Sequence, residues 1–179
     1  MTGNYSQSPR TAALLRAFHR ESARGTVYHW CTASCVTMFK TFSEELGLES
    51  PDYSDYEYLN ELAAWKKSLR AGGMCENHTK VLEAAGWQRY NPEKERVAPG
   101  DIIFFGHPTK KVVVNTTNYR TQFTTRPKAE VGAVVMPDGY AYWWTPIGIL
   151  PIHPEWRQGG MLLRGLRVSP DVSRSVSHA

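Results

Sequence analysis

The chain has 179 residues, of which 41% are hydrophobic and 21% charged, and its formal net charge is +4. These values match ordinary globular proteins, so they argue against a disordered chain and suit one domain with its own core. Three cysteines are too few for a disulfide framework, the first residues lack the basic-then-apolar order of a secretory signal, and no apolar run is long enough to span a membrane.

The basic residues are scattered along the chain, in runs no longer than Lys66-Lys67 or Lys110-Lys111. Nucleic-acid-binding proteins usually concentrate positive charge on one face or in one run. We therefore expect no nucleic-acid partner. The small number of cysteines also suits folding in a reducing cytoplasm.

The first half of the chain has the periodicity of helices. Residues before Ser8 are expected to form a loose arm, and residues 10–24 to form a short amphipathic helix. Residues 56–69 predict another helix, broken by Gly72-Gly73, and residues 74–85 a further one, for which Gly86 is the stop signal.

The central helix of this pattern follows Trp30-Cys31-Thr32-Ala33-Ser34-Cys35. Its apolar face recurs at three- and four-residue steps and ends at Gly47, a suitable C′ residue. Ser34 is a good N-cap, which places Cys35 in the first turn, where the helix dipole favours a thiolate. Cys35 is therefore a candidate nucleophile. The alternative is a small apolar core residue, since free cysteines are often buried.

After Trp87 the pattern changes to strands. Residues 116–128 are polar and predict a long loop or an irregular hairpin, and the serine-rich tail from Ser169 is expected to be flexible or partner-dependent. Helices followed by strands predict an α+β fold in which the cysteine helix packs on an antiparallel sheet. The predicted strands are residues 102–105, 111–115, 131–136, 140–144, 147–152 and 161–168.

Several of these features occur in an order typical of one family. Trp30 lies five residues before Cys35, Pro99-Gly100-Asp101 leads into a hydrophobic strand, and Val131-Gly132-Ala133-Val134-Val135 is followed by an Asp-Gly turn. The chain thus resembles the NlpC-type, papain-like cysteine peptidases, and in particular the small NlpC-like proteins encoded among phage tail genes. The resemblance covers residues 27–168, which leaves residues 1–26 as an arm with a short helix and residues 169–179 as a polar tail.

The resemblance implies a nucleophile at Cys35 and a general base at Glu130. The family has a histidine where this chain has Glu130, and Ser34 replaces the usual Asp or Asn before the nucleophile. A carboxylate with an ordinary pKa near 4.3 is a poor base for this chemistry, and its charge would raise the thiol pKa. The third polar residue, which orients the base in the family, has no clear counterpart here.

Other residues offer alternatives to this pair. His107 follows the first long strand and is the best remaining base candidate, ahead of His29 and His153. Cys31 is a second candidate nucleophile outside the family register. Three cysteines and one histidine could instead form a structural zinc shell. These residues are Cys31, Cys35, Cys75 and His78.

We therefore expect a phage virion component of the tail tip or baseplate, made in the host cytoplasm and structural or adaptor-like because its active site is degenerate. The alternative is an active cysteine peptidase or amidase that hydrolyses peptidoglycan during genome entry, with Cys35 as nucleophile. The expected partners are other tail or baseplate proteins, and peptidoglycan under the alternative. Neither of these two hypotheses requires a cofactor or a resident metal. A zinc-stabilised interaction domain is a third hypothesis.

Overall fold

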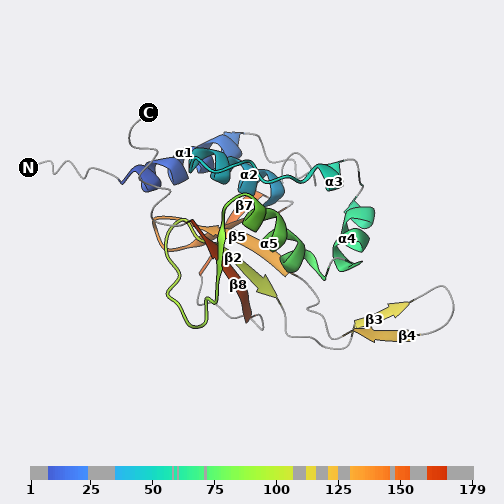
Figure 1. The fold of residues 1–179 in the computed structure, drawn as a ribbon. Coiled ribbons are helices and arrows are strands. Elements are labelled where there is room, and N and C mark those ends of the chain that lie inside the picture. Colours follow the sequence, from blue (N-terminus) through green and yellow to red (C-terminus); the bar gives the residue numbers. More distant parts are fainter. Residues whose placement is uncertain are drawn as a thin grey trace, which may run out of the picture.

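A computed structural model describes most of the chain (Figure 1). The described residues are 8–23, 35–57, 59, 61–70, 72–106, 112–115, 121–124, 130–145, 148–153 and 161–168. The helices among them are α1 (Pro9–Ala23), α2 (Cys35–Glu45), α3 (Ser54–Glu57), α4 (Glu61–Arg70) and α5 (Met74–Ala84). The strands are β1 (Gln88–Tyr90), β2 (Ile102–Gly106), β3 (Val112–Asn115), β4 (Thr121–Thr124), β5 (Glu130–Val135), β6 (Ala141–Thr145), β7 (Gly148–Ile152) and β8 (Met161–Arg167).

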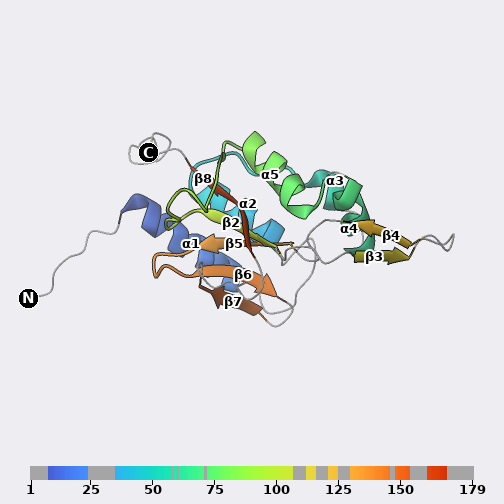
Figure 2. The ribbon, with the colours of Figure 1, turned by 90° about the horizontal axis from the view of Figure 1, so that it is seen from below.

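The main sheet has six antiparallel strands in the order β1-β8-β2-β5-β6-β7. Helices α1, α2 and α5 pack against one face of it, where their apolar side chains join those of β2, β5 and β8 in one core cluster (Figure 2). A smaller cluster forms the other face, around Ile103, Ala133 and Val135. The predicted α+β class is confirmed.

Helix α2 is the centre of the core. An amphipathic surface helix buries one stripe, whereas a helix buried all round lies inside its domain. The buried residues of this segment face every direction: Val36, Thr37, Met38, Phe39, Thr41, Phe42, Ser43 and Leu46. The helix ends as predicted at Gly47, whose φ is 73°. Gly47 N–H bonds to Glu44 C=O and Leu48 N–H to Ser43 C=O, which is the Schellman pattern.

Helix α1 lies along α2 and belongs to the same core. Its start is fixed by Ser8, whose hydroxyl accepts from the Thr11 N–H, and by Pro9 at the first helical position. Ala13, Leu14 and Ala17 are almost completely buried in the main cluster. On the exposed side, ion pairs join the two helices: Arg16 with Glu45, and Arg20 with Glu44 and Glu45.

Two elements differ from the sequence prediction. The helix expected over residues 56–69 is divided into α3 and α4; Leu59 N–H bonds to Tyr56 C=O, an i→i+3 turn in place of helical i→i+4 geometry. The polar stretch 116–128, predicted as a long loop or an irregular hairpin, contains β4, which pairs with β3, so the hairpin is the predicted form that the structure has. Strand β1 was not predicted, because three residues are too few for a period-2 pattern. Within the part of the chain that is described, no helix is long and apolar enough to cross a membrane.

Candidate functional site

Cys35 is the first residue of α2, as the sequence predicts. Ser34, the predicted cap, lies outside the described residues, and so do Cys31, His29 and His107. The candidate site is therefore located through the backbone of α2 and the strands that it contacts.

The direction of α2 over the sheet follows from two contacts. The Phe39 ring lies on Gly132 of β5, so closely that a Cβ at position 132 would be 2.6 Å from Phe39 Cζ. One turn later, the Ser43 hydroxyl accepts from the Trp87 indole N–H at 2.9 Å. Trp87 directly precedes β1. Strand β1 pairs with β8, β8 pairs with β2, and β2 pairs with β5, and this register makes the start of β1 level with the end of β5. Helix α2 thus runs in the same direction as β5.

The beginning of α2 therefore lies toward the end of the sheet where β5 begins and β2 finishes. Glu130, the first residue of β5, pairs with Gly106, the last residue of β2. The two positions that the resemblance assigns to nucleophile and base, Cys35 and Glu130, are thus the first residues of two elements that run side by side. His107 directly follows Gly106 in the sequence.

Among the described residues, His78 of α5 is a histidine that packs against α2. Its ring is enclosed by Phe39, Phe104 and Tyr53, and its Nδ1 is 2.8 Å from the Tyr53 hydroxyl oxygen. Burial lowers the His78 pKa to about 4, because an imidazolium ion would lose its hydration in this apolar surrounding. A general base for thiol chemistry at neutral pH needs a pKa near 7 and access to the reacting atoms. His78 has neither property.

The described residues contain no group of three or more His, Cys, Asp or Glu side chains arranged to hold a metal ion. Within the predicted zinc set, Cys75 and His78 are both buried on α5, and His78 already uses Nδ1 for Tyr53. The zinc hypothesis also needs Cys31 and the Cys35 thiol, neither of which is described.

A buried carboxylate, which the sequence analysis did not identify, lies on the other side of α2. Glu21, in the last turn of α1, is completely buried and accepts hydrogen bonds from the Thr37 hydroxyl at 3.1 Å and the Thr41 hydroxyl at 2.5 Å. These threonines belong to the first two turns of α2. The signal was present in the sequence, because Glu21 falls on the apolar stripe of α1 that also contains Ala13, Leu14 and Ala17.

Asp101, the last residue of the Pro-Gly-Asp turn, has a structural role at the far end of β5. Only 1% of its side chain is exposed. Its Oδ2 accepts from the Tyr90 hydroxyl at 2.7 Å, the Ala98 N–H at 2.9 Å and Arg167 Nη2 at 3.1 Å. Arg10 of α1 approaches Oδ1 at 3.8 Å. One carboxylate thus connects the start of α1, the turn before β2 and the end of β8.

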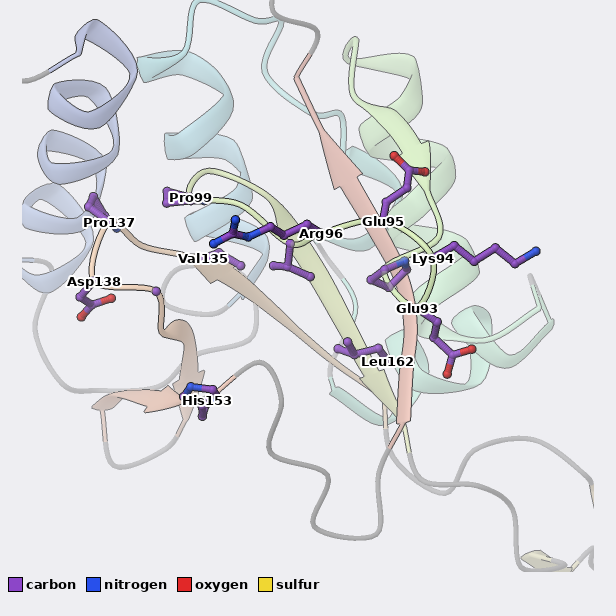
Figure 3. A pocket seen from close by; sticks show the side chains of 13 residues that line it. Glu93, Lys94, Glu95, Arg96, Pro99, Val135, Pro137, Asp138, His153 and Leu162 are labelled. Carbon is purple, nitrogen blue, oxygen red and sulfur yellow. The ribbon is translucent and has the colours of Figure 1, made fainter.

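A hollow of about 800 Å³ opens on the face of the sheet opposite α2 (Figure 3). Its floor includes Val135 and Leu162, and its rim is formed by residues 92–97, the turn at Pro137-Asp138-Gly139, and His153. The Asp138 carboxylate is already occupied, since it accepts from the Tyr140 N–H and the Tyr142 hydroxyl. His153 therefore lies by this hollow, at the opposite end of β5 from Glu130, and not beside the start of α2.

We compared the chain with protein-family models, with curated proteins and with solved structures, and none of the three comparisons found a match.

Proposed function

We propose that this protein is a phage virion component of the tail tip or baseplate, built on an NlpC-like, papain-like α+β domain whose catalytic site has degenerated into a structural or adaptor role. The observation that supports the loss of catalysis is the identity of the residue that opens β5. This residue is Glu130. It lies at the end of the sheet where β5 begins, and the beginning of α2 lies toward the same end. The tail location is supported by the sequence resemblance.

The charge expected at position 130 also disfavours an active thiolate. A carboxylate there would raise the pKa of a neighbouring thiol. A cysteine peptidase needs the opposite arrangement, in which an imidazolium ion stabilises the thiolate and then protonates the leaving amine. Neither His78 nor His153 supplies this imidazole, because His78 is enclosed and His153 lies at the opposite end of β5 from Glu130.

One observation favours the alternative, an active cysteine peptidase or amidase that acts on peptidoglycan. Cys35 is the first residue of a helix, where the free N–H groups and the helix dipole lower a thiol pKa. In an active enzyme the base would be His107, because it directly follows the residue that pairs with Glu130.

The test compares phage particles that carry the wild-type chain with particles that carry Cys35→Ala. If the protein is a structural component, both chains are present in purified particles in equal amounts and the two preparations infect equally well. The purified wild-type protein then releases no more peptide from peptidoglycan than Cys35→Ala does. Absence of the chain from particles would refute the virion role, and turnover that Cys35→Ala abolishes would establish the enzyme; His107→Ala is then the next variant.

A further inference from the structure

The hollow on the face of the sheet opposite α2 has two ordered sides. On one side, Arg167 of β8 holds the loop at residues 92–97, because its Nη2 donates to the Arg96 carbonyl at 3.0 Å and its Nη1 pairs with Glu95 at 3.4 Å. On the other side, the Asp138 carboxylate holds the turn between β5 and β6 by accepting from a backbone N–H at 2.9 Å and a tyrosine hydroxyl at 2.6 Å. Both sides are thus fixed by the protein's own contacts, and a ligand would not have to order them.

The floor of the hollow is apolar. Val135 and Leu162 are only 2% and 8% exposed, and the half-buried Val97 packs against the same cluster. Trp143 of β6 and Ile152 of β7 are also half-buried and pack against that cluster, so the apolar surface continues beyond the hollow. Contiguous apolar surface marks interaction sites more often than isolated apolar residues do. Apolar side chains of a bound segment would find cover both in the hollow and beside it.

One cation, the Arg96 guanidinium, faces this apolar floor. It forms no hydrogen bond or ion pair with any other residue that the structure describes. In Figure 3 its side chain points across the hollow toward the turn at Asp138, whereas those of Glu93 and Lys94 point away from β5. The other two acids on the rim, Glu95 and Asp138, already accept from donors of the protein. The charge left to attract a ligand into the hollow is therefore positive.

A guanidinium above an apolar floor favours one kind of anion. Its planar fork matches a carboxylate, which it binds through two parallel hydrogen bonds. A phosphate group usually takes several cations or the free N–H groups of a helix N-terminus, and none of the described residues that line the hollow belongs to a helix. The arrangement therefore matches a singly charged carboxylate that has an apolar group beside it.

We propose that the hollow binds the C-terminus of a partner polypeptide. The terminal carboxylate pairs with Arg96, and the last side chain, which is apolar, lies on Val135 and Leu162. C-terminal carboxylates are a recurrent target of peptide recognition. The residues before the chain end are covered by the apolar surface at Trp143 and Ile152, which a small carboxylic acid would leave bare. The site lies on the other face of the sheet from α2, so the proposal does not depend on the virion role.

The test measures binding of the full chain to short peptides by fluorescence anisotropy. The peptides carry a label at the N-terminus, share a glycine-serine sequence and end in two valines, leucines, isoleucines, methionines or phenylalanines. Each is made with a free C-terminal carboxylate and with a C-terminal amide. We expect at least one acid peptide to bind, and its amide form to bind at least about tenfold more weakly, because the amide lacks the charge that pairs with the guanidinium.

The site variant is Arg96→Gln, which removes the guanidinium but keeps the backbone carbonyl that Arg167 holds. The matched control is Arg70→Gln, the same change at an exposed position of α4. We expect Arg96→Gln to weaken binding of the acid peptide at least about tenfold, and the control to change it little. Arg96→Lys keeps the charge without the planar fork and gives an intermediate affinity. Val97→Ser removes apolar surface from the floor and weakens binding about threefold.

Any of three results would overturn the proposal. They are an absence of binding by every acid peptide at concentrations up to about 1 mM, equal affinity of acid and amide forms, and equal weakening by Arg96→Gln and Arg70→Gln. A competition arm separates a chain end from a small acid: if N-acetylleucine binds as tightly as the best peptide, the hollow takes a small carboxylic acid and the proposal fails. Circular dichroism shows whether each variant is folded. If Arg96→Gln is not, the comparison of acid and amide peptides on the wild-type chain decides.

Discussion

At the scale of single residues, His78 determines how the core responds to acid. The groups that face it are Phe39 from α2, Phe104 from β2 and the Tyr53 hydroxyl, and none of them is a charged side chain. The folded protein therefore holds a neutral imidazole with a pKa of about 4, whereas the unfolded chain has the ordinary value of 6.5. Unfolding is accompanied by proton uptake throughout the pH range between these two values.

The sign of the pH effect follows from this difference. The unfolded state binds more protons below pH 6.5, so the free energy of unfolding falls as the pH decreases from 6.5 to about 4. The His78 contribution amounts to about 3 kcal/mol over that range. We expect His78→Gln, which stays neutral, to remove that part of the pH dependence, measured as urea-unfolding free energies at pH 7 and pH 4.5. His19→Gln on the exposed side of α1 is the control. If both variants keep the wild-type dependence, His78 is not the titrating group.

The sequence indicated some of these residues and not others, for a physical reason. Cys35 and Gly47 were predicted because a helix terminus has a local signature, a cap at one end and a glycine with positive φ at the other. The pairing of His78 with Tyr53 joins residues 25 positions apart, and that of Asp101 with Arg167 joins residues 66 apart. Such contacts depend on how the elements pack, so no local pattern predicts them.

At the scale of elements, the contact between α2 and β5 depends on the absence of a side chain at Gly132. A Cβ there would lie 2.6 Å from Phe39 Cζ and 2.9 Å from Phe104 Cε1. Both rings are almost completely buried, so neither can move without opening the core. Gly132 therefore sets how closely the cysteine helix approaches the sheet.

We expect Gly132→Ala to lower the free energy of unfolding by about 1–3 kcal/mol, the usual cost of forcing an extra methyl group into a packed core. Phe39→Leu shortens the opposing side chain. The double variant should therefore be more stable than the sum of the two single effects predicts, by at least about 0.5 kcal/mol. Urea unfolding of all four proteins measures this coupling. Strict additivity would mean that the α2–β5 distance is set elsewhere.

Strands with a long and regular sequence pattern were predicted more accurately than elements whose pattern is short or irregular. Strands β2, β5, β6, β7 and β8 were predicted to within one residue at each end, because apolar runs bounded by turn residues are distinctive. The division between α3 and α4 was missed, because the apolar spacing continues across it while the backbone makes an i→i+3 turn. The region of β4 was predicted as either a long loop or an irregular hairpin, and the sequence did not decide between them because these strands alternate little between apolar and polar residues.

At the scale of the whole molecule, α1 joins regions that are distant in the sequence. Arg10 approaches Asp101 in the turn before β2, Glu21 accepts from α2, and the Phe18 ring packs edge-on against Tyr142 of β6 with centroids 5.2 Å apart. Leu14 is 1% exposed within the main core cluster. Helix α1 thus covers the same core as α2, and removing it would expose apolar surface and leave Asp101 with one fewer cation.

We therefore expect deletion of residues 1–23 to abolish cooperative unfolding, because the loss of several buried side chains is comparable to the whole stability of an ordinary domain, about 5–15 kcal/mol. Deletion of residues 1–7, the arm predicted from the sequence, is the matched control and should leave the thermal midpoint unchanged. Circular dichroism during heating measures both. If the chain without residues 1–23 still unfolds in one sharp transition near the wild-type temperature, α1 is an accessory to the domain, and the contacts of Arg10, Leu14, Phe18 and Glu21 contribute little to its stability.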